Sequence, residues 1–179
     1  MLRHLPNLIC LVRIALVWPT CDALQAGDYW TALVLVAVCA VSDGLDGWLA
    51  KRFNWTSHLG KTLDPLADKL LLVALFLTAT WINLVPWWLT AVVVARDVMI
   101  GAGAVIYRAW FGPLHGRPTL MSKINTGMQL AVALAAILGA ASGLPTPEMV
   151  TALAFVTLLT TIVSGADYLA AFTRRALAT

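Results

Sequence analysis

Four aspartates stand out because they are carboxylates in an otherwise apolar stretch of sequence, grouped in two pairs. Asp43 and Asp46 are three residues apart, and Asp64 and Asp68 are four residues apart. Because side chains with these spacings lie on one face of a helix, each pair can share a ligand. Carboxylates are the hard oxygen donors that Mg²⁺ or Mn²⁺ prefers, and four suffice for two such ions. Paired divalent ions neutralise phosphate oxygens, so the pattern indicates a displacement at phosphorus.

The two pairs belong to successive apolar segments, Tyr29–Ala50 and Gly60–Leu84. At ~1.5 Å per residue, the first pair lies roughly 6 and 11 Å before the end of its segment, and the second roughly 6 and 12 Å after the start of its own. If the segments pack as an antiparallel hairpin, the four carboxylates meet at one level. Each would cost roughly 2.5–3.5 kcal/mol in a bilayer without a partner. The alternative to metal is ion pairing between helices, with Lys51, Arg52, Lys61 and Lys69 as the nearest cations.

The elements that must position these residues are expected to be membrane helices. The 179 residues are 60% hydrophobic with a mean hydropathy of +0.83, which excludes an ordinary soluble domain. The apolar runs are long enough to cross about 30 Å of hydrocarbon. We predict an all-α integral membrane protein with six transmembrane helices in a single domain, residues 1–179. The predicted spans are Leu5–Cys21, Tyr29–Ala50, Gly60–Leu84, Val85–Tyr107, Ser122–Ser142 and Met149–Phe172.

The charges of the connections predict the orientation of the chain. Lys and Arg gather in the second and fourth connections and at the C-terminus, whereas the first, third and fifth connections carry only acids or no charge. The positive-inside rule then puts both termini and the acidic cluster on the cytoplasmic side of a multi-pass protein. The first half of the first span contains Arg3 and Arg13, so it could also form an interfacial amphipathic segment before the chain turns inward.

The acidic stretch resembles the signature of the CDP-alcohol phosphotransferase family, D-x-x-D-G-x-x-A-R followed by G-x-x-x-D-x-x-x-D. The matching positions are Asp43, Asp46, Gly47, Ala50, Gly60, Asp64 and Asp68. Lys51 stands where the family has Arg, which keeps a cation but not its bidentate grip. The resemblance implies that the first three aspartates hold metal, that Asp64 and Asp68 share a second ion, and that Asp68 is the general base. It also implies that the CDP-lipid site is formed by Gly47, Ala50, Lys51, Ser57 and Gly60.

Other stretches bear on the acceptor. The opening Leu5-Pro6-Asn7-Leu8-Ile9 with Arg13, the run Ala95–Ile100 and the run Pro118–Gln129 are similar to phosphatidylglycerophosphate synthases and CMP-forming cardiolipin synthases. This favours a glycerol-type acceptor and leaves glycerol 3-phosphate and phosphatidylglycerol both open. The candidate acceptor-binding cations are Arg96, Arg117 and Lys123. For Arg96, a contribution together with Asp97 to ion pairing between helices is an equal alternative. Asn125 and Gln129 share a helix face and could line the same cavity, although bonding across helices is the favoured expectation.

Together these features predict transfer of a phosphatidyl group from CDP-diacylglycerol to a glycerol-type acceptor with release of CMP. The expected cofactors are two Mg²⁺ or Mn²⁺ ions, and the expected partners are both lipid substrates, the bilayer and a second copy in a homodimer, with no nucleic acid. The rival function is a divalent-cation transporter. Transport would require polar residues to continue toward the outer face, but Tyr29–Val41 and Leu70–Ile82 are almost wholly apolar.

Overall fold

The structure is a computed structural model that describes the backbone of residues 5–53, 60–111 and 119–177, and the side chains of residues 10–42, 67–106, 110, 119–170 and 173. This part of the chain forms six α-helices, so the predicted all-α class is confirmed. The helices are α1 (Leu5–Gln25), α2 (Tyr29–Phe53), α3 (Gly60–Trp81), α4 (Trp87–Phe111), α5 (Leu120–Ser142) and α6 (Pro147–Leu177).

The helix bounds differ from the predicted spans chiefly at the ends. Helix α1 continues through Pro19 to Gln25, and it is unbroken from Leu5, so no turn separates its amphipathic start from its apolar remainder. Helix α3 ends at Trp81 because the next residues turn: Asn83 has a φ of 61°, and the Leu84 amide donates back to the Ala79 carbonyl at 2.8 Å. A residue with positive φ at this position ends a helix and satisfies its last carbonyls.

Local capping explains where two other helices begin and end. The Asp28 carboxylate accepts a hydrogen bond from the Thr31 amide at 3.2 Å and so caps α2. The hydroxyl and amide of Thr31 together hold the pKa of Asp28 below its usual value. Helix α5 begins after Thr119, whose hydroxyl accepts from the Ser122 amide, and it ends at Gly143, which has a φ of 82°.

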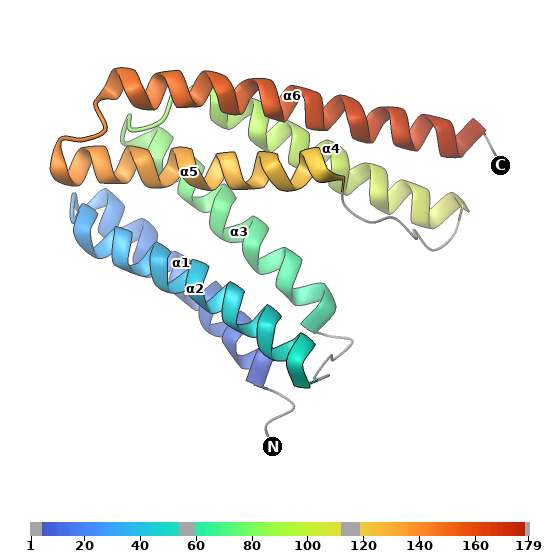
Figure 1. Ribbon diagram of the computed structural model, residues 1–179, viewed down its shortest axis with the longest axis horizontal. Helices are drawn as coiled ribbons and strands as arrows, with labels where there is room; N and C mark the ends of the chain where they lie inside the picture. The colour runs from blue at the N-terminus through green and yellow to red at the C-terminus, as the bar shows by residue number, and fades with distance from the viewer. Residues whose placement is uncertain (1–4, 54–59, 112–118, 178–179) are drawn as a thin grey trace.

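The six helices run alternately up and down, so the two ends of the bundle differ (Figure 1). The turns between α1 and α2, α3 and α4, and α5 and α6 lie at one end. The end of α2, the start of α3, the end of α4 and the start of α5 lie toward the other end, as do the start of α1 and the end of α6. Both aspartate pairs therefore belong to the end at which α1 starts and α6 finishes.

Helices α3 and α5 lie at the centre of the packing. Helix α1 packs against α2 and α3, while α6 packs against α4 and α5. Helix α5 also contacts α2 and α3, which joins the two groups. The predicted direct hairpin packing is not seen in the described part of the chain: α2 and α3 are linked through α1 and α5. The physical reason is that α1 presents a buried face to both of them.

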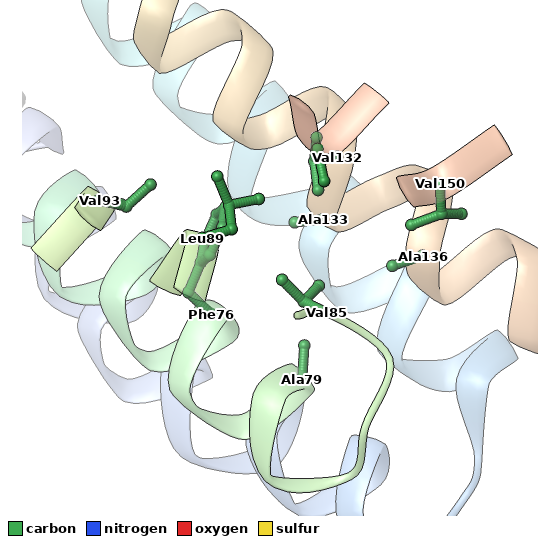
Figure 2. Packing of buried hydrophobic residues seen from close by; sticks show 10 residues of the cluster. Phe76, Ala79, Val85, Leu89, Val93, Val132, Ala133, Ala136 and Val150 are labelled. Atoms are coloured by element: carbon green, nitrogen blue, oxygen red, sulfur yellow. The ribbon is translucent and has the colours of Figure 1, made fainter. Parts of the chain in front are cut away.

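Two apolar clusters fill the bundle. The first joins α3, α4, α5 and α6 through residues such as Phe76, Leu89, Val132 and Val150, with four buried alanines in the same cluster (Figure 2). The second joins α1, α2, α3 and α5, with Leu24, Val36, Leu75 and Ile137 as its larger members. The small residues allow helix axes to approach closely, which is how membrane helices associate without a hydrophobic driving force between them.

Three helices are long and apolar enough to cross a membrane by length and composition, within the described residues. They are Trp87–Ile106, Leu120–Ser142 and Pro147–Ala170, and α2 contributes the shorter apolar stretch Tyr29–Ser42. Large apolar side chains on these helices face outward, including Val105, Leu159 and Leu169. An exposed apolar surface of this extent identifies a membrane protein.

Candidate active site

The predicted site residues fall on α2 and α3, near the end of one helix and the start of the next. Asp43 and Asp46 lie in α2, and Asp64 and Asp68 lie in α3. Their helical backbone confirms that each pair has the spacing of one helix face. The side chains of Asp43, Asp46 and Asp64 lie outside the described part, whereas the side chain of Asp68 is described.

Asp68 is ion-paired with a buried arginine of the first helix. The Arg13 Nη1 atom donates to the Asp68 Oδ1 atom at 2.6 Å. The arginine side chain is 1% exposed, while the carboxylate is 41% exposed. The guanidinium is therefore enclosed by protein, while the Asp68 side chain borders open space.

That open space is a cavity of about 150 Å³ between α1, α2, α3 and α5, which we call the Asp68 pocket. It is lined by Arg13, Val36, Cys39, Ala40, Asp68, Leu71, Leu72, Thr126 and Leu130. Helices α2 and α3 thus face each other across a cavity. The described walls are mostly apolar, with Arg13, Asp68 and Thr126 as the polar exceptions.

The helical periodicity of α2 and α3 continues the pocket-lining face of each helix toward the acidic residues. On α2, position 43 follows Cys39 by four residues and Ala40 by three, so it continues the face that lines the pocket. On α3, position 64 precedes Asp68 by four residues and continues that face in the same direction along the bundle. Positions 43 and 64, which carry aspartates, therefore come next to the described lining of the Asp68 pocket at the same end of the bundle.

These donors fit a divalent metal by their chemistry. Carboxylate oxygens are the preferred ligands of Mg²⁺ and Mn²⁺. Among the described side chains no three histidines, cysteines or acids gather closely enough to hold an ion. Of the three cysteines, Cys10 and Cys39 are buried and Cys21 is partly buried, as predicted for packing residues.

A second cavity continues along α5 from the Asp68 pocket. It measures about 330 Å³ and is lined by Ser122, Lys123, Thr126, Gly127 and Leu130, of which two also line the Asp68 pocket. We call it the Lys123 pocket. Lys123 is exposed, so its ammonium can meet a solvent-borne or lipid anion there.

Other predicted residues lie outside the described side chains. Gly47, Ala50 and Lys51 belong to the last turns of α2, and Gly60 is the first residue of α3. Ser57 and Arg117 lie outside the described residues altogether.

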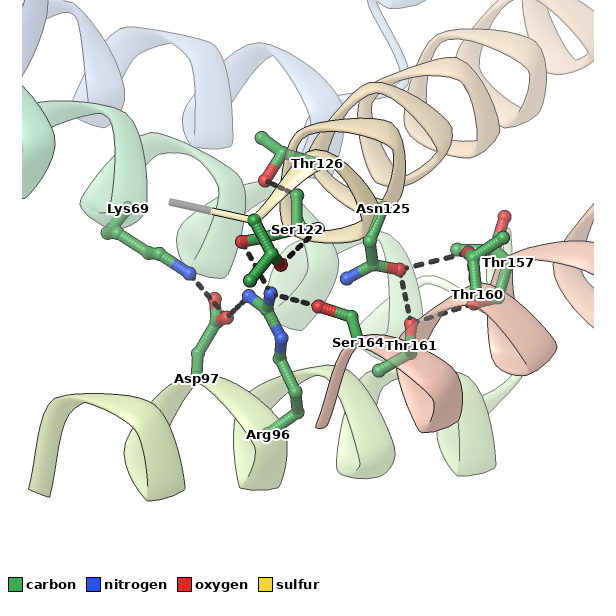
Figure 3. Close-up of polar contacts among 11 residues, drawn as sticks. Lys69, Arg96, Asp97, Ser122, Asn125, Thr126, Thr157, Thr160, Thr161 and Ser164 are labelled. Atoms are coloured by element: carbon green, nitrogen blue, oxygen red, sulfur yellow. Dashed lines mark hydrogen bonds and ion pairs between the residues drawn. The ribbon is translucent and has the colours of Figure 1, made fainter. Parts of the chain in front are cut away.

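Arg96 is the centre of a polar cluster that joins four helices (Figure 3). Its Nη1 atom donates to Asp97 at 2.7 Å, and its Nη2 atom donates to the hydroxyls of Ser122 at 2.8 Å and Ser164 at 2.6 Å. Lys69 of α3 forms an ion pair with the same Asp97 oxygen. We call these five residues the Arg96 cluster. The Arg96–Asp97 contact within α4 and the Lys69–Asp97 ion pair between α3 and α4 match the ion-pairing alternative for Arg96. The guanidinium also lies 5.8 Å from the ring centre of Tyr168.

Asn125 extends this polar face by one turn of α5. Its Oδ1 atom accepts from the hydroxyls of Thr160 at 3.0 Å and Thr161 at 2.8 Å, both on α6 (Figure 3). The predicted bonding across helices is thus confirmed for Asn125. For Gln129, both side-chain polar atoms are buried and have no hydrogen-bond partner within the described part of the structure.

A larger cavity, of about 350 Å³, lies at the opposite end of the bundle. Its walls come from the turn between α3 and α4 and the turn between α5 and α6, including Asn83, Trp87 and Pro145. None of the described residues that line it is titratable. These walls therefore lack the groups that acid–base or metal chemistry requires.

Sequence reasoning missed the role of Arg13 as the counterion of Asp68. It also placed Lys69 among the cations near the acidic pairs, whereas Lys69 contacts Asp97. The positions of Arg13 and Asp68 along their helices could have indicated this ion pair. Arg13 lies about 12 Å along its helix from Leu5, and Asp68 lies about 12 Å from Gly60, so the two are level at the same end of the bundle.

The chain is similar to known proteins over most of its length. It is 37% identical over 143 residues to a Drosophila melanogaster protein named probable cardiolipin synthase (CMP-forming). The aligned region covers 71% of this chain and 44% of that protein. It is 34% identical over 149 residues to the cardiolipin synthase (CMP-forming) of Homo sapiens, which covers 74% and 50%. The chain spans about half the length of these relatives.

The aligned region covers a larger share of a bacterial relative. The chain is 32% identical over 145 residues to the CDP-diacylglycerol–glycerol-3-phosphate 3-phosphatidyltransferase of Escherichia coli (strain K12). The aligned region covers 75% of this chain and 76% of that protein. The family model described as CDP-alcohol phosphatidyltransferase matches residues 3–166, a region that includes Arg13 and the four aspartates. The chain therefore belongs to the CDP-alcohol phosphatidyltransferase family.

Proposed function

We propose that the protein transfers a phosphatidyl group from CDP-diacylglycerol to a glycerol-type acceptor and releases CMP. One observation carries the proposal: a half-exposed carboxylate, Asp68, faces a cavity whose α2 and α3 walls lead in helical register to positions 43 and 64. Carboxylates arranged around one cavity supply a base and a set of metal ligands for displacement at phosphorus. The names of the relatives identify the same reaction class in other members of the family.

In the proposed reaction Asp68 takes the proton of the acceptor hydroxyl. The hydroxyl oxygen then forms a bond to the phosphorus that carries the diacylglycerol, and the bond from that phosphorus to the oxygen of CMP breaks. CMP leaves with the electron pair, and the proton stays on Asp68. Because Asp68 is partly exposed and close to Thr126, an acceptor bound along α5 can reach it.

Asp43, Asp46, Asp64 and Asp68 would hold two Mg²⁺ or Mn²⁺ ions. Such ions, when bound, neutralise the oxygens of the diphosphate and stabilise the leaving phosphate. The cytidine diphosphate would lie against Gly47, Ala50, Lys51, Ser57 and Gly60, where residues without bulky side chains let a nucleotide approach the backbone. Lys51 would contribute a point charge toward phosphate in place of the family arginine.

The acceptor would bind along the Lys123 pocket, which shares two residues with the Asp68 pocket. Lys123 and Arg117 would attract its phosphate, and Arg96 would act through Ser122, to which it donates at 2.8 Å and which lines the pocket. The higher identity to proteins named cardiolipin synthase, 37% against 32%, favours phosphatidylglycerol over glycerol 3-phosphate as this acceptor.

We further propose that all six helices cross the membrane, with both termini and the Asp68 pocket on the cytoplasmic side. The basic residues of the second and fourth connections and the C-terminus support this orientation. The acids Asp22, Asp28 and Glu148 belong to the opposite end. A homodimer, as the resemblance implies, would be tested by the mass of the detergent-solubilised protein.

A transport function is less well supported, because the Asp68 pocket does not continue through the described part of the bundle. Beyond Val36 and Leu71 the space between α1, α2, α3 and α5 is filled by buried apolar residues, including Leu24, Leu75 and Ile137. A transported ion would need oxygen ligands along that path. An enzyme that takes both substrates from one side needs none.

The test is CMP release by the purified protein from CDP-diacylglycerol, with Mg²⁺ or Mn²⁺ and with phosphatidylglycerol or glycerol 3-phosphate in separate reactions. We expect metal-dependent CMP release that is fastest with phosphatidylglycerol. Asp68→Asn should lower the rate by roughly 10²- to 10⁴-fold, the usual contribution of a general base. If the folded wild-type protein releases no CMP with either acceptor, the proposal is wrong.

A further inference from the structure

Arg13 is a buried cation in the middle of a helix that the proposed reaction does not yet use. Its side chain is 1% exposed, and its helix is otherwise made almost entirely of apolar residues in this region. Arginine is rarely buried so completely in proteins, and placing its charge inside a membrane helix is costly without a specific partner. The burial therefore indicates a defined task for the guanidinium.

The geometry ties that task to Asp68. The Nη1 atom of Arg13 donates to Oδ1 of Asp68 at 2.6 Å, across a sequence separation of 55 residues. Both side chains line the Asp68 pocket, but the arginine is enclosed while the carboxylate is 41% exposed. The guanidinium is thus the enclosed member of the pair, and the Asp68 side chain is the accessible one.

A carboxylate held at one oxygen by a fixed donor cannot rotate freely. The terminal torsion of aspartate is broad, so a fixed donor restricts the orientations that the partly exposed Asp68 carboxylate samples. Packing around Arg13 restricts the guanidinium, and its planar fork keeps the donor direction fixed. Lysine could supply the charge but not this direction, because its ammonium is a point charge on a flexible chain.

We propose that Arg13 is a positioning residue for phosphatidyl transfer, which holds the Asp68 carboxylate in the orientation needed to take the proton of the acceptor hydroxyl. The inference rests on the proposed function and adds a residue of α1 to it. Arg13 acts through Asp68 and contributes to the rate of the chemical step more than to the binding of CDP-diacylglycerol. A purely structural Arg13 would instead serve to attach α1 to α3.

The test compares Arg13→Ala and Arg13→Lys with Thr20→Ala, all on α1. Thr20 is fully buried and donates to the Leu16 carbonyl at 2.7 Å, so its variant is a matched control for a buried polar change on this helix. We expect Arg13→Ala to lower kcat by roughly 10- to 100-fold, as is typical when a residue that orients a reactive ligand is removed. The KM for CDP-diacylglycerol should stay near the wild-type value. The kcat of Arg13→Lys should lie between the kcat of Arg13→Ala and that of the wild-type protein. Thr20→Ala should keep the wild-type kcat.

Two further readouts separate positioning from a structural role. Guanidinium ion, added well below denaturing concentrations, should enter the space left in Arg13→Ala and raise kcat, whereas urea has the same shape without the charge and should not. Mn²⁺ affinity without substrate, measured by electron paramagnetic resonance titration, should weaken in Arg13→Ala and recover with guanidinium. If Arg13→Ala does not fold, Arg13→Lys carries the test, with lower kcat at an unchanged unfolding temperature as the expected result.

Wild-type kcat in a folded Arg13→Ala or Arg13→Lys variant would overturn the inference. The inference would also be overturned if the loss of kcat matches the loss of folded protein and guanidinium does not reverse it. Failure of the proposed function itself has a different signature, because the wild-type protein would then release no CMP in the same assay.

Discussion

Asp97 carries the negative charge on which the Arg96 cluster depends. Its Oδ1 atom contacts both Arg96 and Lys69, and its side chain is 8% exposed. The substitution Asp97→Asn keeps the size of the side chain and removes the charge. Arg96, which is 5% exposed, would retain its serine partners but lose its counterion. Lys69 is 41% exposed and can turn its ammonium toward water.

The expected magnitude follows from this difference in burial. Breaking a buried ion pair by removing one partner costs about 3–5 kcal/mol, because an uncompensated charge remains. The asparagine introduced by Asp97→Asn would still accept a hydrogen bond and Lys69 would not be stranded, so we expect a loss of about 3 kcal/mol in the free energy of unfolding. Arg96→Gln should cost less, about 2 kcal/mol, because it removes hydrogen bonds of a charged group but leaves Asp97 paired with Lys69.

Thermal unfolding in detergent micelles measures both variants. At about 2–4 °C per kcal/mol for a chain of this size, Asp97→Asn should lower the unfolding temperature by about 6–12 °C, and Arg96→Gln by about 4–8 °C. The double variant should lose less than the two single losses combined, since the residues share one interaction. An unchanged unfolding temperature for Asp97→Asn, or a larger loss for Arg96→Gln, would show that Asp97 is not the counterion that Arg96 needs.

Three further predictions concern α5 and use the same unfolding assay. Gln129→Leu should stabilise the protein by about 1 kcal/mol because it removes a buried polar group that has no partner in the described structure, and a loss of stability would show that the amide has a partner after all. Asn125→Ala should cost about 1 kcal/mol through its lost bonds to α6, and no change would mean that those bonds contribute nothing. Gly139→Ala should cost about 1–3 kcal/mol because a methyl group there meets the Pro145 carbonyl. Gly127→Ala, on the same helix with open space around it, is the control and should be neutral or stabilising.

The sequence predicted the helices well because each is a long apolar run bounded by turn residues or charges. The ends were less accurate. Pro19 and the polar residues after it suggested an end for α1 that the helix passes through, and the positive φ of Asn83 could not be read from the apolar run around it. The spacing of the four aspartates was readable because it depends only on helical periodicity.

What the sequence could not reveal is which helices meet. Arg13 and Asp68 are 55 residues apart, and Arg96 and Ser164 are 68 residues apart, so nothing local pairs them. The expected hairpin of α2 and α3 followed from their short connection, but α1 contacts both and a cavity separates them. Tertiary packing, rather than sequence adjacency, decides which cation neutralises which acid.

The account depends on the four aspartates meeting around bound ions at one end of the bundle. Electron paramagnetic resonance of the purified protein with Mn²⁺ tests this most directly, because two ions about 3.5–4 Å apart are magnetically coupled. We expect a coupled spectrum at two Mn²⁺ per chain in the wild-type protein, and its loss in Asp43→Asn and in Asp64→Asn. A spectrum of isolated Mn²⁺ ions, unchanged by either substitution, would contradict the account.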